Sequence, residues 1–461
     1  MPKHPAFRIG LVVLGLALLW AISQATVSAY LQADAQAQQQ RYAEGLGPFI
    51  WPMRSSSELV GGSVHGSDQW QLTAGGLQLR VSAEGATVAL HLHGRLLSTA
   101  QLDTLHLQLH ANSMVSLDVL LSSADGESLT SQANLSIPEG GGQFAIALPT
   151  AIVSNQLRLY FRADSPASLR LQTVWLSAER CAAPPCQPPT QTLLPAARVE
   201  TLLLARDAGL AEAPQSLWLS AFPNLPGWPA LIRTPPLSDI GLPLLAISLS
   251  GWALWLRRSR SRPVVELIAV LGPIVLALLL GWPNVDRAVV HWFLPLMSFS
   301  AAIVFGDCET RRFSWLGDFL AWRAYLRPTL AMTTVLIVVA LAQKSVRWPA
   351  IDDVLRYVLW AAVQQLLLIR FVAPRVVMIT QSRTELALTC GFLFALLHLP
   401  NFSLALLTAM AGAWWAVIGH HHRALLPALT SHAVLGLLVV AALPPNWLRS
   451  AEVGIRFVFA P

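Results

Sequence analysis

The first long apolar stretch of the chain lies near its beginning and is typical of a membrane segment. Residues 9–22 are almost all apolar and follow the basic residues Lys3 and Arg8, as in secretory signals and N-terminal anchors. The small residues up to Ala29 resemble a signal-peptidase site, so a cleaved signal and a retained anchor both fit. In both cases the next part of the chain is exported, and the Ala- and Gln-rich residues 32–41 predict a helical stalk.

Beyond the stalk, apolar and polar residues alternate strictly, with the period of two that indicates β-strands. The alternating segments are short, regularly spaced and separated by Gly, Asp, Asn, Ser and Pro, which predicts an exported β-sandwich or jelly roll. The apolar positions of these strands are Leu77/Leu79/Val81, Val88/Leu90/Leu92, Leu105/Leu107/Leu109, Leu117/Val119/Leu121, Phe144/Ile146/Leu148, Leu157/Leu159/Phe161 and Leu169/Leu171.

Residues 181–236 are rich in proline and weakly patterned, which predicts a linker with one short helix near residues 197–208. Cys181 and Cys186 flank Ala-Ala-Pro-Pro in this exported segment, where oxidation is permitted. We therefore expect a disulfide between them. The chain has four cysteines, which are too few for a disulfide framework and match no zinc motif.

After residue 237 the apolar stretches are nearly continuous and predict an all-α, polytopic transmembrane bundle. Basic clusters follow the first, third, fifth and seventh stretches and fall on the side of Lys3 and Arg8, as the positive-inside rule requires. Lys344 and Arg347 fall on the opposite side. The eight predicted spans are residues 240–256, 264–282, 289–305, 329–342, 354–372, 386–399, 403–418 and 425–443.

Composition supports the same class. Of the 461 residues, 54% are hydrophobic and only 12% are charged, whereas soluble domains contain about 25% charged residues. The net charge of +6 comes from clusters beside apolar stretches, so we interpret it as a topology signal and expect no nucleic-acid partner. The sequence predicts a multi-domain, multi-pass protein of a bacterial inner (plasma) membrane with a large periplasmic or extracellular domain.

Polar side chains inside membrane helices are unfavourable and point to function by default. The last four predicted spans contain Gln364, Gln365, Arg370, His398 and His432. Two histidines on different helices, facing a third helix with an amide pair and an arginine, would converge on one buried polar site. Such a site would hold a water molecule or a metal, and the sequence leaves the metal and any other cofactor open.

Two short motifs in this region resemble a known family. Phe394 and His398 share one helix face at i, i+4, before Pro400 ends the helix and Asn401 follows. Ser431-His432 forms the core of a second motif on a later helix. In order and spacing these motifs resemble those of the CAAX-protease and bacteriocin-processing membrane proteins, the CPBP or Abi family.

This resemblance covers residues 354–443 and implies a glutamate-type intramembrane endopeptidase acting on a membrane-associated protein or peptide substrate. The catalytic positions that it implies are Gln365, Arg370, His398 and His432.

The chain departs from the family pattern at chemical positions. Counted back from Arg370, the two glutamate positions of the family fall on Gln365 and Leu366, and Gly436 stands where the third motif has Asn or Asp. An amide orients water but does not accept its proton, and Gly436 removes an expected oxyanion stabiliser. The resemblance therefore implies a retained fold with a degenerate catalytic site.

No other carboxylate is well placed to replace the missing base. Glu385 begins the predicted helix of His398, but 13 residues separate the two by about 20 Å along the axis. Asp352, Asp353 and Glu266 lie toward helix ends, far from the centre of the predicted site.

These residues also have structural interpretations. Buried histidines and glutamines join membrane helices by hydrogen bonds worth about 0.6 kcal/mol each, and Arg370 is close enough to a helix end to snorkel to the interface. The run 420–422 of three histidines fits a solvated, positive-inside loop better than a metal site.

Four histidines of the exported domain lie on strands. His91 and His93 share one strand face, and His106 and His110 share another. These imidazoles meet only if the two strands pair as a hairpin, and otherwise they lie on a solvated outer sheet face.

Three functions are compatible with these features. The first is an intramembrane peptidase of unusual chemistry, and the second is a non-catalytic relative that binds a helix or a lipid-linked substrate. The third is a sensor or assembly factor whose exported β-sandwich binds a glycan or a protein. The predicted regions are a membrane segment at 1–31, a stalk at 32–65, the β-sandwich at 66–180, the linker at 181–236 and the bundle at 237–461.

Overall fold

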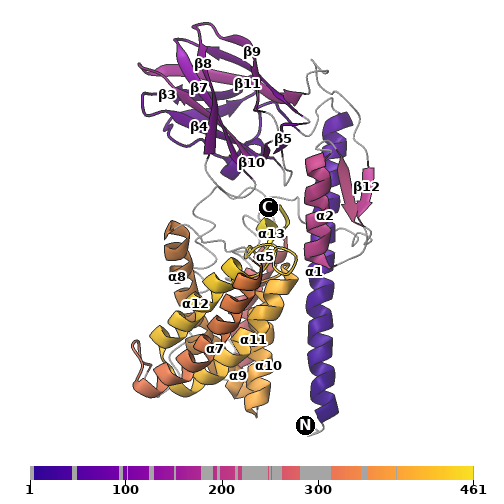
Figure 1. Cartoon of the computed structure of the whole chain (residues 1–461), viewed down its shortest axis with the longest axis vertical. Helices are drawn as coiled ribbons and strands as arrows, with labels where there is room; N and C mark the ends of the chain where they lie inside the picture. The colour runs from indigo at the N-terminus through magenta and orange to yellow at the C-terminus, as the bar shows by residue number, and fades with distance from the viewer. Residues whose placement is uncertain are drawn as a thin grey trace.

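In the computed structural model, a long N-terminal helix stands beside a β-sandwich and a bundle of C-terminal helices (Figure 1). Cys181 and Cys186 lie outside the described residues, so the disulfide stays a prediction, as do the spans 240–256 and 289–305. The structure describes residues 5–43, 49–92, 97–100, 102–123, 129–149, 152–177, 191–194, 198–212, 216–220, 248, 251, 262–280, 313–343, 351–380 and 382–459.

The first helix, α1 (Pro5–Ala43), contains both the predicted membrane segment and the predicted stalk. Its 39 residues measure about 58 Å along the axis, nearly twice the hydrocarbon thickness of a bilayer. Leu11 and Val13 are exposed, whereas Tyr30 and Leu31 are buried against the linker and the C-terminal segment. The N-terminal half of α1 is therefore the part that carries exposed apolar surface.

The region predicted to be exported is an antiparallel β-sandwich. The first sheet has the strand order β2-β3-β11-β6-β9, with β1 also paired to β11, and the second has the order β4-β10-β7-β8, with β5 also paired to β10. The strands are β1 (Ile50–Trp51), β2 (Trp70–Thr73), β3 (Gly76–Val81), β4 (Ala86–Leu90), β5 (Leu97–Ser98), β6 (Thr104–Ala111), β7 (Val115–Ser123), β8 (Leu129–Ile137), β9 (Gly142–Ala147), β10 (Val153–Arg162) and β11 (Ala167–Ser177).

The alternating sequence determines which strand face is buried. In β6, Leu105, Leu107 and Leu109 are buried, while Gln108 and His110 between and after them are exposed. The same alternation in β3, β7, β10 and β11 brings the inner faces of both sheets into one apolar core. The outer faces are thus left to polar side chains.

The predicted linker contains more regular structure than its sequence pattern indicated. The expected helix is α2 (Val199–Glu212), and it is flanked by β12 (Gln191–Leu194) and β13 (Leu217–Ser220), which pair in parallel. Val199, Leu202 and Leu203 of α2 are buried in a cluster shared with α1 and the C-terminal segment.

The C-terminal region is helical. Its elements are α5 (Arg262–Leu280), α7 (Phe319–Gln343), α8 (Ile351–Leu366), a π-helical segment (Leu367–Val372), α9 (Ala373–Ile379), α10 (Arg383–Leu396), α11 (Phe402–His422), α12 (Leu425–Ala442) and α13 (Ile455–Phe459). Small residues allow close helix packing, since a Cβ at Gly391 would lie 2.5 Å from the carbonyl oxygen of Ala409 and one at Gly412 would lie 2.7 Å from Phe394.

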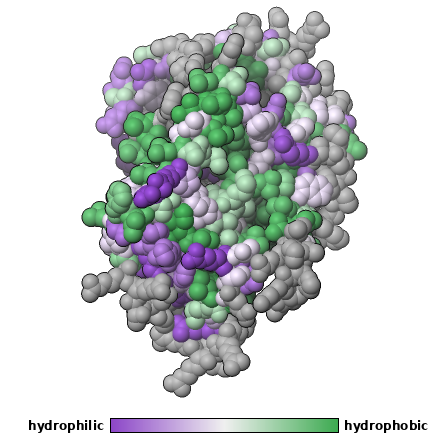
Figure 2. Space-filling model, turned by 60° about the horizontal axis from the view of Figure 1, so that its bottom comes forward, coloured by the Kyte–Doolittle hydropathy of each residue, from purple (hydrophilic) through white to green (hydrophobic). Residues whose placement is uncertain are grey.

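Five helical segments of the described residues are long and apolar enough to cross a membrane, namely Gly10–Gln40, Phe319–Gln343, Tyr357–Ile379, Phe402–His422 and Leu425–Ala442. Exposed apolar surface is clearest on α7, where Leu330, Val335, Val338 and Leu341 are exposed. With the lower end of the molecule turned forward, hydrophobic side chains cover much of the described surface, interrupted by hydrophilic patches (Figure 2).

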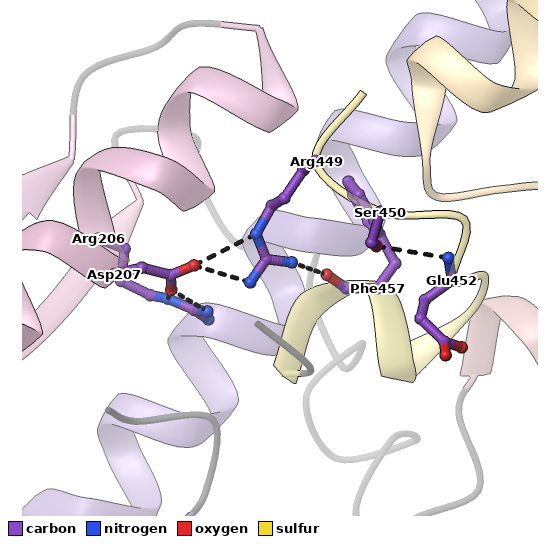
Figure 3. Close-up of polar contacts among 6 residues, drawn as sticks. All are labelled: Arg206, Asp207, Arg449, Ser450, Glu452 and Phe457. Atoms are coloured by element: carbon purple, nitrogen blue, oxygen red, sulfur yellow. Dashed lines mark hydrogen bonds and ion pairs between the residues drawn. The ribbon is translucent and has the colours of Figure 1, made fainter. Parts of the chain in front are cut away.

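A polar cluster, here called the C-terminal clasp, joins α2 to the segment after α12 (Figure 3). Asp207 Oδ2 accepts hydrogen bonds from Nε and Nη2 of Arg449 at 3.2 and 2.7 Å, and its Oδ1 accepts one from Nε of Arg206 at 2.9 Å. Arg449 also donates through Nη1 to the carbonyl of Phe457. The arginine is buried, so this ion pair fixes both segments.

The turn between α10 and α11 is held at the same end of the molecule. Asn401 caps α11 and donates through Nδ2 to the carbonyls of Ser450 at 2.7 Å and Glu452 at 3.2 Å. Glu200 at the start of α2 accepts a hydrogen bond from the backbone N–H of Ser403 at 2.8 Å. The linker helix, the C-terminal segment and the turn after His398 thus form one assembly.

Candidate functional site

The structure brings two of the predicted site residues into direct contact. Gln365 on α8 and His432 on α12 are both buried, and the Gln365 amide Nε2 lies 3.0 Å from the His432 Nδ1 atom. The amide donates and the imidazole accepts, which places the ring proton of a neutral His432 on Nε2. The other amide atom, Oε1, has no hydrogen-bond partner among the described residues.

His432 lies in a box of aromatic rings. Its ring stacks on Trp415 with centroids 4.4 Å apart, and the rings of Phe394 and Tyr357 each lie 6.0 Å away in edge-on contacts. Beside it, Ser431 Oγ accepts a hydrogen bond from the Trp415 indole at 3.0 Å. These contacts hold His432 in one orientation.

His398 lies at the end of α10 and contacts the same aromatic box through Phe394. The two rings have centroids 5.0 Å apart. Its Nδ1 atom lies 2.7 Å from the backbone carbonyl of Phe394, so Nδ1 is the donor and Nε2 keeps its lone pair. Phe394 therefore contacts both histidines, which approach the site from two different helices.

Tyr357 on α8 belongs to this site, although the sequence pattern did not single it out. A Cβ atom built on Gly436 would lie 1.7 Å from the hydroxyl oxygen of Tyr357. The tyrosine therefore occupies the space into which the Asn or Asp side chain of the resembled motif would extend. Tyr357 packs in its observed position only because residue 436 is a glycine and has no side chain.

The other two predicted polar residues lie apart from the Gln365–His432 pair. Arg370, in the π-helical segment, is exposed and places its guanidinium over the ring of Phe313 at 5.5 Å. Gln364 lines a small apolar cavity of about 20 Å³ together with Leu271 and Phe394, which is room for about one water molecule. The described contacts of Arg370 fit the snorkelling alternative.

No carboxylate contacts Gln365, His398 or His432 among the described residues. Glu266 accepts hydrogen bonds from Arg262 at 2.6 Å and Arg375 at 3.0 Å, so it neutralises arginines of α5 and α9. Glu385 lies at the opposite end of α10 from His398, in the first helical turn. The side chains of Asp352 and Asp353 lie outside the described set.

Metal-type ligands do not gather in the described part of the chain, where no three His, Cys, Asp or Glu side chains come together. In the run 420–422, the rings of His421 and His422 meet edge to face with centroids 4.7 Å apart at the end of α11.

A second candidate site is the outer face of the six-stranded sheet. Neighbouring strands place polar side chains in rows, because residues in register across a sheet lie about 4.8 Å apart. One row crosses four strands and consists of Gln71, Gln78, Arg170 and His110. The amide groups of Gln71 and Gln78 are 2.9 Å apart. When the Gln78 amide oxygen faces Arg170, it accepts hydrogen bonds from the Arg170 Nε atom at 3.2 Å and from its Nη2 atom at 3.0 Å.

An aromatic pair lies on the same face, four residues along β6 from His110. His106 stacks on Trp175 of β11 with centroids 4.8 Å apart and planes within 5°. Its Nε2 atom lies 2.8 Å from Ser177 Oγ, which fixes the ring. Partial burial lowers the pKa of His106 below its ordinary value, so the neutral ring is favoured. Trp175 is buried and His106 is partly exposed, so His106 presents the accessible ring of the pair. A partly exposed ring, with amides and a guanidinium farther along the same face, suits a ligand with an apolar ring face and many hydroxyls.

The hairpin considered for the exported histidines is not formed. The strand before His91 is β4 of the five-stranded sheet, whereas His106 and His110 lie on β6 of the six-stranded sheet. Burial lowers the pKa of His91, and His93 lies outside the described residues. The alternative of an outer sheet face describes His106 and His110 correctly.

Comparison with known proteins gives matches to part of the chain only. No family model matches, and no curated protein matches. A carbohydrate-binding module of family CBM4 is 20% identical over 25% of this chain and 93% of its own, with a TM-score of 0.21. A xylan-binding module, CBM86 from Roseburia intestinalis, is 16% identical over 28% of this chain and 92% of its own, with a TM-score of 0.21.

A third solved structure is a CBM32 module in complex with 4,5-unsaturated mannuronic acid. It is 16% identical over 26% of this chain and 96% of its own, with a TM-score of 0.20. These values are too low to transfer a ligand, and any ligand of this sandwich depends on the side chains of its own outer face.

Proposed function

We propose that this chain is a membrane-anchored glycan-binding protein whose exported β-sandwich binds carbohydrate on the outer face of the six-stranded sheet. The observation that carries the proposal is the His106–Trp175 stack, which lies on the same face as the row of Gln71, Gln78 and Arg170. A pyranose ring has an apolar face and a rim of hydroxyls. In a short oligosaccharide, one ring would stack on the aromatic platform, and the hydroxyls of a neighbouring ring would bind amide or guanidinium partners farther along the sheet.

The proposal is tested by measuring oligosaccharide binding to the full-length protein in nanodiscs of neutral lipid. We expect His106→Ala to weaken binding about fivefold, because loss of one stacking contact is worth about 1 kcal/mol. His65→Ala is the matched control, since His65 is an exposed histidine that pairs with β4 of the other sheet. Wild-type affinity in His106→Ala, or no glycan binding at all, would contradict the proposal.

A second candidate function belongs to the helical bundle. The Gln365–His432 hydrogen bond supports a CPBP-like cleft that holds a membrane-anchored protein or peptide without cleaving it. Positioned proton transfer accelerates such a reaction by a factor of about 10²–10⁴, and an amide in the place of the general base does not provide it. The unpartnered Oε1 of Gln365 leaves one acceptor for a bound backbone N–H.

We expect the wild-type protein to show no peptidase activity that depends on His398 or His432. The measurement is cleavage of a membrane-anchored reporter peptide by wild type, by His398→Ala and by Gln365→Glu, which restores the acidic residue of the resembled motif. Robust wild-type cleavage that His398→Ala abolishes would exclude the non-catalytic interpretation.

A further inference from the structure

The outer face of the six-stranded sheet has an unusual charge pattern. None of its strands β1, β2, β3, β6, β9 and β11 contains an Asp or Glu residue, although these strands supply Arg80 and Arg170 as well as His106 and His110. Among the described residues no carboxylate pairs with either arginine. The outer face of the five-stranded sheet is different, because there Arg162 pairs with Asp118 at 2.8 Å.

Arg170 is held in place by uncharged partners. Gln78 accepts from its Nε and Nη2 atoms, and Gln71 in turn contacts Gln78. A guanidinium has five N–H donors, so this arrangement orients Arg170 without neutralising its charge. The side chain is exposed, and His110 lies in register with it on the neighbouring strand.

His110 adds a second oriented group to the same row. Its Nδ1 atom lies 2.6 Å from the carbonyl oxygen of Gly140, so Nδ1 is the donor of that hydrogen bond and Nε2 does not take part in it. The His106–Trp175 stack lies four residues away along β6, which is about 14 Å. A short oligosaccharide is long enough to contact both ends.

We infer that the ligand of this face is an acidic glycan, in which sugar carboxylates pair with Arg170 and Arg80 while a sugar ring stacks on His106. The inference rests on the proposed function and narrows it from carbohydrates in general to uronic-acid polysaccharides. A planar guanidinium binds a carboxylate through two parallel hydrogen bonds. Because the strands of this face contain no Asp or Glu, they present no like charge to a bound carboxylate.

The experiment compares matched glycans on the full-length protein in nanodiscs of neutral lipid. Oligosaccharides of polygalacturonate, alginate and hyaluronan are each titrated beside their carboxyl-reduced, uncharged forms. We expect at least one acidic form to bind about tenfold or more tightly than its reduced form at low salt. The difference should fall to about twofold near 1 M salt, where the Debye length is about 3 Å.

Two arginine variants identify the charged subsite. Arg170→Gln should remove most of the difference between an acidic glycan and its reduced form, because it should weaken binding of the acidic form by a much larger factor than binding of the reduced form. Arg162→Gln is the matched control on the opposite outer face, and it should bind as wild type does.

The failures of the two proposals are distinguishable. If neutral forms bind as tightly as the acidic ones and His106→Ala weakens both, the glycan function stands and the acidic preference is wrong. If no glycan of either kind binds, both the glycan function and the acidic preference are wrong. Both are also wrong if the protein binds anionic vesicles or acidic peptides but no glycan.

Discussion

At the scale of single residues, the contact between Tyr357 and Gly436 decides how α8 meets α12. Gly to Ala in a helix normally adds stability of about 0.5–1 kcal/mol. Here the added Cβ would lie 1.7 Å from the tyrosine hydroxyl oxygen and 2.5 Å from its ring carbon Cζ. We therefore expect Gly436→Ala to destabilise the protein by about 1–3 kcal/mol, as overpacking does. Thermal unfolding of the full-length protein in detergent measures the effect.

Removing the tyrosine provides the control. If the clash is the cause, Gly436→Ala should be harmless in a Tyr357→Ala background, so the double-mutant cycle should show a coupling of about 1 kcal/mol or more. Additive effects of the two changes would show that Gly436 is required for some other reason.

The predicted polar site illustrates what a single sequence reveals about residues. Gln365 and His432 were predicted to converge because each interrupts an apolar helix, and their contact at 3.0 Å agrees with that reasoning. Tyr357 was missed because an aromatic residue in a membrane helix gives no polar signal. Its importance depends on the space beside Gly436, which only the packing of two helices defines.

At the scale of elements, the C-terminal clasp is the contact whose loss should be most visible. Arg449 is buried and Asp207 nearly so, with side-chain exposures of 2% and 14%. Removal of one partner leaves a buried charge uncompensated, which destabilises by about 3–5 kcal/mol. We expect Asp207→Asn to accelerate amide hydrogen exchange in α2 and α13 while the exchange of α11 stays close to that of wild type.

An exposed pair on the same segment is the matched control for the clasp. Arg456 and Glu452 form an ion pair at 3.2 Å with side-chain exposures of 73% and 35%, and exposed pairs contribute about 0–1 kcal/mol. Arg456→Gln should therefore leave the exchange of α2 unchanged. If Asp207→Asn and Arg456→Gln changed the exchange of α2 equally, the burial of the clasp would not be the reason for its contribution to stability.

The sandwich should also respond to acid. Burial lowers the pKa of His91 and of His106 below the ordinary value of 6.5. The unfolded chain therefore binds more protons than the folded chain below about pH 6.5, and stability falls as the pH falls through this range. The protection factors of β4 and β6 amides, which correct for the slower intrinsic exchange at lower pH, should fall between pH 7 and pH 5. A His91→Gln, His106→Gln double variant should show a flatter dependence, and an unchanged slope would argue against these two groups.

How far elements follow from sequence depends on the signal that each strand carries. Leucines at every second position predicted β6, β7 and β10, and the structure has them. β8 (Leu129–Ile137) reads LTSQANLSI and lacks that alternation, so it was missed. Strand neighbours were also beyond the sequence pattern, because β11 pairs with β3 and β6 across long stretches of chain. The sequence alone therefore did not predict that Arg170 and His110 lie side by side, because their register depends on the pairing of β11 with β6.

At the scale of the whole molecule, the contacts of the C-terminal segment show at which ends of the helical bundle the two ends of the chain lie. Arg449 contacts Asp207 of the linker helix, and Asn401 contacts Ser450 and Glu452. The C-terminus therefore lies at the end of the bundle nearer the sandwich, whereas the chain begins at the opposite end of α1 (Figure 1).

This arrangement agrees with the charge pattern of the sequence. α11 has 21 residues and is about 32 Å long, enough to place Asn401 and His422 at opposite sides of a bilayer. His422 is followed directly by Arg423, on the side to which the basic clusters assign the cytoplasm.

We therefore predict that a reporter enzyme fused after Pro461 is active only if it requires export, for example a phosphatase that needs disulfides. The same reporter inserted after His422 should be inactive there, and a fluorescent protein that folds only in the cytoplasm should give the opposite result at both positions. The clasp supplies the physical reason, because a buried Arg449–Asp207 pair cannot form across a bilayer. If the C-terminal reporter were active in the cytoplasm, Arg449 and the exported linker would lie on opposite sides of the membrane. That result would refute both this topology and the clasp.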